Sequence, residues 1–219
     1  PASNQALSCV AVYDIAMSPA GFAVVADVPI ETAINNAILW QSLSLVYGVG
    51  TLWAVPSTAR DRLLSSLPPD ERRSAHKLAG DFLRDVGESG GYAELQLSRL
   101  DCLLEARGHY LEAGDLEDAR AVTARISGYL EKRGYYSELI RLNQELLGEP
   151  HVEPMTWIAR SYADQGDYGR AREWYGRAIE IAPVASAYQG LGMAYLFMGK
   201  HDLARENLQK AVDIYISDE

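Results

Sequence analysis

The sequence predicts a mainly α-helical protein, with helix hairpins in its C-terminal part and a small β-hairpin among the helices of its N-terminal part. Two observations favour this fold class: a 33-residue repeat near the C-terminus, and a single change from helical to alternating periodicity near residue 43. The 219 residues are 48% hydrophobic, which is enough for a continuous core. We therefore expect the chain to be folded throughout.

The first 86 residues predict three helices, a β-hairpin and two further helices. Ser18 and Pro19 form a helix start, with serine as the cap and proline in the first turn. Alternation over residues 43–47 and a second β-rich run over 51–55 predict two strands, with a turn at residues 48–50. The predicted helices are 7–15, 19–26, 30–41, 57–66 and 69–86.

Three helices followed by a two-stranded wing form the winged-helix arrangement. The ordered run VAVYDIAMSPAGFAVVADV, AINNAILWQSLSLVYGVGTLWAVPSTARDRLL and PPDERRSAHKLAGDFL resembles the winged-helix segment of signal-transduction ATPases of the apoptotic and plant-resistance type. The resemblance implies that residues 1–86 are an adaptor domain and that an ATPase domain lies upstream. Because the chain starts at Pro1 without a methionine, we expect it to be a piece of a longer protein. Val55-Pro56-Ser57 stands where that family has a nucleotide-contacting Met-His-Asp motif, so the resemblance does not extend to nucleotide sensing.

Residues 87–150 predict degenerate helical repeats. Glycines at 87, 90 and 91 predict a flexible linker at the start of this segment. Ala-Gly-Asp at 113–115 and Arg-Gly-Tyr at 133–135 predict turns between helices. The predicted helices are 92–113, 116–132 and 135–147.

The segment 151–219 carries the clearest repeat. Tyr162, Gly166, Ala171 and Ala178 recur 33 residues later as Tyr195, Gly199, Ala204 and Ala211. The alanines allow two helices to approach closely, and the glycines end the first helix of each hairpin. Together with Tyr168, Tyr175 and Pro183, this arrangement closely resembles the tetratricopeptide family over residues 152–217. The resemblance implies two repeats in a right-handed array of antiparallel helix pairs, a continuation that is frequent in bacterial members of the ATPase class.

Tetratricopeptide stacks present the first helix of each hairpin to a groove that holds a peptide or a partner helix. Helical geometry predicts that six side chains face this groove. They are Trp157, Arg160, Asp164, Gln189, Met193 and Phe197. Met193 and Phe197 are four residues apart and share a face, which suits an apolar anchor. The alternative is that these side chains contact a further repeat or a neighbouring domain.

The charge pattern opposes nucleic-acid binding. The formal net charge is −10, and residues 1–59 contain no Lys or Arg. The helix 30–41, which would enter a major groove in a DNA-binding winged helix, offers Glu31, Asn35, Asn36 and Gln41 but no cation. A DNA-binding transcription regulator is therefore a disfavoured alternative.

No catalytic, cofactor or metal signature is present in the sequence. It contains no GxxxxGK[ST] loop, no GxGxxG after a strand and no GxSxG elbow. His76, His109, His151 and His201 are scattered over different predicted elements, and none has a second ligand at metal spacing, so we expect no metal site. Two distant cysteines fit a reducing cytoplasm, and no apolar stretch is long enough to span a membrane.

These patterns predict a non-enzymatic regulatory module. We expect the helical array to bind a protein or peptide partner, including other domains of the same polypeptide, within a larger signal-transduction ATPase or transcription regulator. A stand-alone scaffold that holds two proteins together is the alternative from another class.

Overall fold

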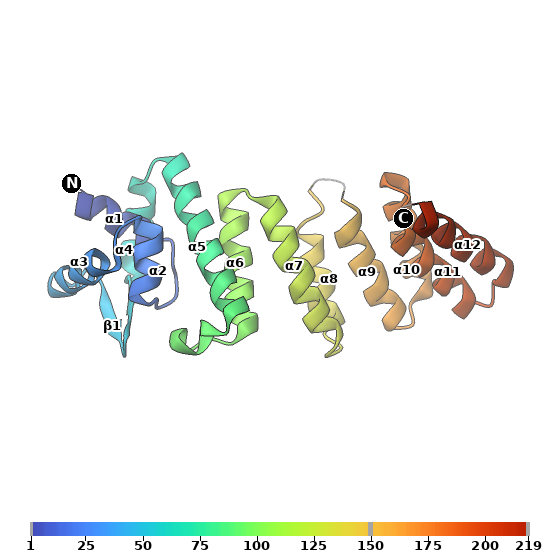
Figure 1. The fold of residues 1–219 in the computed structure, drawn as a ribbon, viewed down its shortest axis with the longest axis horizontal. Helices are drawn as coiled ribbons and strands as arrows, with labels where there is room; N and C mark the ends of the chain where they lie inside the picture. The colour runs from blue at the N-terminus through green and yellow to red at the C-terminus, as the bar shows by residue number, and fades with distance from the viewer. Residues whose placement is uncertain (1, 149–150, 218–219) are drawn as a thin grey trace. The chain divides into compact units, whose positions relative to one another are not determined.

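The computed structural model describes residues 2–148 and 151–217, and within them it confirms the mainly α-helical fold class (Figure 1). Twelve α-helices, one short 3-10 helix and one β-hairpin make up this described part. The chain divides into two compact units, Pro1–Val122 and Thr123–Glu219, with the division inside helix α7 (Leu116–Glu131). The finer predicted segments 1–86, 87–150 and 151–219 stay a prediction.

The N-terminal unit is built around the long helix α5. Its elements before α7 are α1 (Ala2–Val10), α2 (Pro19–Ala26), α3 (Ile30–Ser42), β1 (Tyr47–Val49), β2 (Leu52–Ala54), α4 (Ser57–Ser66), α5 (Pro69–Ser89), the 3-10 helix Gly91–Leu95 and α6 (Arg99–Ala113). Helix α1 packs on α2, α4 and α5, while α2 packs on α3 and α5. Helix α6 packs along α5.

The predicted start of α2 is confirmed, whereas the helix expected at 7–15 is misplaced. The Ser18 hydroxyl accepts a hydrogen bond from the Gly21 amide at 3.3 Å, as a helix cap should. Helix α1 instead ends at Val10, and the chain turns through buried residues as far as Tyr13. The reason is that a short apolar run fits a buried turn as well as a helix, so periodicity alone cannot place its end.

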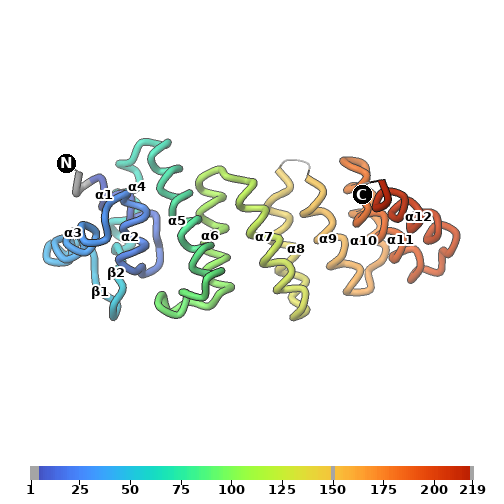
Figure 2. Tube along the Cα trace, in the orientation of Figure 1, coloured from blue at the N-terminus to red at the C-terminus, as the bar shows by residue number. Residues whose placement is uncertain are grey.

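The β-hairpin formed by β1 and β2 is present (Figure 2). Its turn lies later in the sequence than predicted. Gly48 pairs with Trp53 in the antiparallel ladder and therefore belongs to a strand. The turn is at Gly50, whose φ of 62° lies in the left-handed region. Trp53 also exchanges two backbone hydrogen bonds with Met17, of 2.8 and 2.9 Å, which fastens the hairpin to the start of α2.

The flexible linker predicted at residues 87–91 is wrong, because α5 runs to Ser89, a 3-10 helix starts at Gly91, and Gly90 alone, with a φ of 89°, makes the turn between them. Gly87 lies inside α5, and a Cβ atom added there would be 3.2 Å from the Cβ of Cys102. The glycine therefore serves a close approach of α5 and α6 rather than flexibility. Helix α6 begins at Arg99 instead of residue 92, since Ser98 and Asp101 form a reciprocal capping box.

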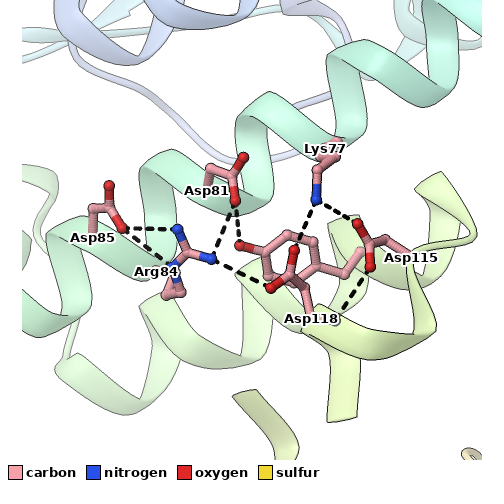
Figure 3. A network of polar contacts seen from close by, with 7 residues as sticks. Lys77, Asp81, Arg84, Asp85, Asp115 and Asp118 are labelled. Atoms are coloured by element: carbon pink, nitrogen blue, oxygen red, sulfur yellow. Dashed lines mark hydrogen bonds and ion pairs between the residues drawn. The ribbon is translucent and has the colours of Figure 1, made fainter. Parts of the chain in front are cut away.

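A polar network joins α5 to α6 and to the beginning of α7 (Figure 3). The Lys77 ammonium donates to Asp115 and, at 2.7 Å, to Asp118. Arg84 lies 3.6 Å from the same Asp118 carboxylate, and the Tyr110 hydroxyl donates to Asp81 at 2.7 Å. The turn between α6 and α7 is thus held to α5 by charged side chains.

The C-terminal unit is a succession of antiparallel helices after α7. They are α8 (Tyr136–Gln144), α9 (Val152–Asp164), α10 (Tyr168–Ile181), α11 (Ala185–Phe197) and α12 (His201–Ser217). Each helix from α8 to α12 packs on the next, and α9 also packs on α11. The repeated alanines are buried, and the two repeated glycines have positive φ at the turns, which confirms the two helix hairpins predicted for 152–217.

In the described part of the chain, no single helix is both long enough and apolar enough to cross a bilayer, although α2 and α3, bent by 104°, would pass such a test as a pair.

Candidate protein-binding groove

A groove of about 760 Å³ opens between α9 and α11 of the C-terminal unit. All six side chains that the sequence places in a binding groove line it. These are Trp157, Arg160 and Asp164 from α9, and Gln189, Met193 and Phe197 from α11. The structure thus brings together the predicted set, while the binding role of these residues remains a prediction.

The period of α9 explains which of its residues reach the groove. Met155, Ile158 and Ala159 are buried in the unit's core. Trp157, Arg160 and Asp164 follow one another at spacings of three and four residues, so they occupy the opposite side of the same helix. Because the apolar side of α9 is buried in the core, the side with Trp157, Arg160 and Asp164 faces the groove.

Helix α11 contributes an exposed apolar pair. Met193 retains 39% and Phe197 62% of their accessible surface, and the two are one helical turn apart. The Phe197 ring stacks on the Tyr168 ring of α10, with centroids 5.1 Å apart and an interplanar angle of 11°. This stacking holds an exposed aromatic side chain in one position.

The Tyr175 ring of α10 forms the floor of the groove. A Cβ atom added at Gly190 would lie 2.2 Å from this ring, so α11 can lie against Tyr175 only with glycine at that position. Burial raises the pKa of the Tyr175 phenol to about 12, and the hydroxyl is therefore neutral at physiological pH. The floor is uncharged and mostly aromatic.

The charges at the groove are unevenly matched. Arg160 is ion-paired with Glu131 of α7 and lies over the Trp157 ring, 5.7 Å from its centroid. Glu153 and Asp164 are exposed at the rim. Among the described lining residues Arg160 is the one guanidinium or ammonium group, and its charge is already matched by Glu131. The groove therefore presents net negative charge to an incoming partner.

Sequence reasoning missed the contributions of α10 and of the first turn of α9. It considered only the first helix of each hairpin, whereas Tyr168 and Tyr175 come from the second. Their spacing of seven residues, two helical turns, was the available signal that both lie on one face. Glu153 precedes Trp157 by four residues, so the same rule would have placed it on the groove side.

Residues 152–217 match the family profile described as tetratricopeptide repeat. This part of the chain is therefore similar to tetratricopeptide repeats, helix hairpins that in general serve protein–protein interaction. The profile leaves residues 1–151 outside the match, including the segment likened above to a winged helix. A comparison with curated protein sequences gives no match.

Several solved structures share a helical arrangement with the chain at low identity. "MamA RS-1 ArsTM double mutant" is 15% identical, covers 84% of this chain and 96% of its own, and has a TM-score of 0.48. "Crystal structure of MamA" is 20% identical over 68% of this chain and 95% of its own, with a TM-score of 0.42. The BtubC (BKLC) structure from P. vanneervenii is 16% identical over 86% and 80%, with a TM-score of 0.46.

Proposed function

We propose that this chain is a protein-interaction module without catalytic activity, and that its groove binds a peptide segment with an apolar anchor beside a basic residue. The observation that carries the proposal is the exposure of Phe197 and Met193 inside a groove that all six predicted side chains line. The tetratricopeptide match of residues 152–217 supports it.

The exposed aromatic surface of the groove supports an apolar anchor in the bound peptide, because contact of this surface with water is unfavourable. A partner side chain packed between Phe197, Met193 and Trp157 would remove their apolar surface from water. Central aromatic contacts of this kind contribute about 2 kcal/mol or more each to binding. The stacked Tyr168 limits the entropy that Phe197 would lose on binding.

The acidic rim of the groove supports a basic residue in the bound peptide. Glu153 and Asp164 lie on α9 at the edge of the same groove, and the chain as a whole carries a formal net charge of −10. A Lys or Arg beside the apolar anchor would meet these carboxylates. Complementary charge of this kind mainly raises the association rate and selects among partners.

The experiment is selection of binding peptides from a random displayed library, followed by titration of the selected peptides. A quadruple variant carries alanine at Trp157, Arg160, Met193 and Phe197. A matched control carries alanine at four exposed α12 residues outside the groove: Leu203, Arg205, Val212 and Ile216. Circular dichroism verifies that both variants are folded.

We expect selected peptides to be enriched in an aromatic or large aliphatic residue next to Lys or Arg. The quadruple variant should bind them at least 30-fold more weakly, whereas the α12 control should bind as the wild type does. Equal binding by the wild type and the quadruple variant would refute the groove, as would failure of the library to yield any groove-dependent peptide.

We propose further that the N-terminal segment is a winged-helix adaptor and that the chain regulates a larger signal-transduction ATPase. The order of three helices, a hairpin and two helices supports this, as does the tetratricopeptide array that follows. In this arrangement a ligand in the groove would favour one of two conformations of the whole protein, which requires different affinities for the two. Nucleotide hydrolysis by the full-length protein, with and without a selected peptide, is the test. An unchanged rate at saturating peptide would contradict a regulatory role and favour the scaffold alternative.

A further inference from the structure

The groove between α9 and α11 follows both helices over almost their whole length. Its lining includes Glu153 in the first turn of α9 and Asp164 at the last position of that helix. On α11 the lining extends from Ser186 in the first turn to Phe197 at the end. A ligand that fills the groove therefore lies beside about three turns of each helix.

The two carboxylates of α9 mark the two ends of this groove. Asp164 follows Glu153 by eleven residues, which is close to three full helical turns. The two side chains therefore lie on the same side of α9, about 16 Å apart along its axis. Trp157 and Arg160 lie between them on that side. The groove thus has a separate negative charge at each end.

Both end carboxylates are available to a partner. Glu153 and Asp164 are exposed, and neither forms an ion pair with another residue of the described part of the chain. Arg160, which lies between them, is ion-paired with Glu131. Cationic groups of a partner are therefore attracted to the two ends of the groove and not to its middle.

The exposed apolar pair of α11 lies at the Asp164 end. Helix α10 is joined to α9 and to α11 by short turns, so α9 and α11 run in the same direction. The Phe197 ring stacks on Tyr168, which follows Asp164 by four residues across the turn between α9 and α10. Asp164 is thus the carboxylate near the apolar anchor site, and Glu153 is the distant one.

The size of the groove distinguishes an extended ligand from a helical one. A volume of about 760 Å³ over a length of about 16 Å gives a mean cross-section of about 46 Å². An extended chain occupies about 48 Å², because strands lie about 4.8 Å apart within a sheet and sheets pack about 10 Å apart. An α-helix of 10–12 Å diameter occupies about 80–110 Å². The groove therefore matches an extended segment.

We propose that the groove binds an extended peptide segment with two basic residues, four or six positions apart, one at each carboxylate. This inference rests on the function proposed above for the groove. An extended chain advances about 3.3 Å per residue, so 16 Å corresponds to about five residues. Alternate side chains point to opposite sides, and both basic residues must face α9, so an even spacing fits. The apolar anchor is next to the basic residue that meets Asp164.

Labelled synthetic peptides test the spacing. Each peptide carries the same aromatic anchor next to one lysine, in a background of Gly and Ser. A second lysine is placed two, four, six or eleven positions from the first, on either side of the anchor, and glutamine replaces it in the reference peptides. Eleven positions is the spacing that a helical ligand would need to reach both carboxylates. Fluorescence polarisation measures the Kd of the full chain for each peptide at 0.05 M NaCl.

Two conservative variants assign each lysine to its carboxylate. Glu153→Gln and Asp164→Asn each remove one charge and keep the size of the side chain. Glu180→Gln is the matched control, because Glu180 is exposed on α10 and lies outside the groove. Circular dichroism verifies that the three variants are folded.

We expect the second lysine to strengthen binding about threefold to fivefold at a spacing of four or six, which is the usual effect of one exposed charge pair at low salt. This gain should disappear in Glu153→Gln and persist in Asp164→Asn and Glu180→Gln. The lysine next to the anchor should lose its contribution in Asp164→Asn instead.

The outcomes separate this inference from the function on which it rests. Peptides that depend on the groove but gain nothing from a second lysine, or gain most at eleven positions, would overturn the inference and leave the proposed function standing. A gain that survives Glu153→Gln would do the same. Equal binding of every peptide to the wild type and to the quadruple groove variant would overturn both.

Discussion

At the scale of single residues, the C-terminal unit depends on one glycine that no turn requires. Gly190 lies in the middle of α11, where alanine would ordinarily be the better helix former. The Tyr175 ring occupies the space that a side chain at this position would need. The aromatic floor of the groove and the glycine above it are therefore one packing unit.

We predict that Gly190→Ala destabilises the protein by about 1–3 kcal/mol, because the new methyl group must displace the Tyr175 ring. Urea unfolding monitored by circular dichroism measures the effect. Gly176→Ala in α10 is the matched control, since an added Cβ there meets nothing within 4 Å and should stabilise the helix slightly. Equal effects of the two substitutions would show that helix propensity, and not the Tyr175 contact, decides the outcome.

Phe197 differs from Gly190 because its side chain is exposed. Removing it should therefore change peptide affinity much more than the free energy of unfolding. We predict that Phe197→Ala changes the free energy of unfolding by less than about 1 kcal/mol, corresponding to the lost stacking on Tyr168. Affinity for groove-binding peptides should fall at least tenfold, measured by fluorescence of a labelled peptide. A variant that loses stability but keeps affinity would place Phe197 in the fold and not in the binding site.

At the scale of elements, local hydrogen bonds between a capping residue and the first helical turn determine where a helix starts. The sequence pattern alone does not always show which residue is the cap. Helix α6 begins at a capping box in which the Ser98 hydroxyl accepts from the Asp101 amide, and the Asp101 carboxylate accepts from the Ser98 amide. Hydrogen bonding of the Asp101 carboxylate to the side chain and the backbone amide of Ser98 also lowers the pKa of this carboxyl.

We predict that Ser98→Ala costs about 1 kcal/mol of stability, because it leaves one amide at the α6 start without its partner. Thermal unfolding measures the loss. Ser98→Thr should retain most of the stability, since threonine offers the same hydroxyl. Equal loss in both variants would argue against the cap.

The Lys77 network acts between elements, and its contribution depends on pH in two directions. Asp115 has its pKa lowered, chiefly by the hydrogen bond from Lys77, so its stabilising effect is present above about pH 4 and is lost as pH falls through the folded-state pKa. Lys77 has its pKa raised by the hydrogen bonds to Asp115 and Asp118. Its effect is present below about pH 10 and is lost as pH rises through the folded-state pKa.

We predict that Lys77→Met lowers the free energy of unfolding by about 1 kcal/mol at pH 7, a modest value because Lys77 is partly exposed and screened by solvent. The difference from the wild type should shrink below about pH 4, as Asp115 becomes protonated. Unfolding in urea at pH 7 and pH 3 tests this. A difference of the same size at both pH values would mean that lost packing of the lysine stem causes the effect.

At the scale of the whole molecule, the dominant property is its negative charge. The formal net charge is −10, and two of the exposed carboxylates that contribute to it, Glu153 and Asp164, lie at the groove rim. Long-range attraction of a basic partner is screened by salt, because the Debye length falls from about 10 Å at 0.1 M to about 3 Å at 1 M.

We predict that raising NaCl from 0.05 to 0.5 M slows association of a basic groove-binding peptide about tenfold and changes its dissociation rate little. Surface plasmon resonance separates the two rates. A variant with E153K and D164K should bind more slowly at low salt and show a weaker salt dependence. An unchanged association rate in that variant would show that the rim does not attract the partner.

The sequence by itself determined much of the C-terminal unit. Alanine, glycine and tyrosine at a 33-residue period specify helix hairpins through contacts between residues that are near in sequence, and helical geometry then selects the groove-facing side chains. The six predicted residues line one groove for that reason. The start of α2 could be predicted because Ser18 caps its own helix.

Only the tertiary structure decided which distant residues meet. Gly87 looked like part of a linker because its contact, Cys102, lies on another helix. Tyr168 lines the groove from α10, the second helix of its hairpin, whereas the sequence analysis considered only the first helix of each hairpin. Lys77 binds Asp115, which lies 38 residues away in the sequence. His76 and His109, which lie 33 residues apart in the sequence, form a hydrogen-bonded pair because α5 packs on α6. Helical periodicity and helix capping depend on residues that are close in the sequence. Contacts between side chains of different helices depend on how the helices are positioned, and only the packed core establishes those positions.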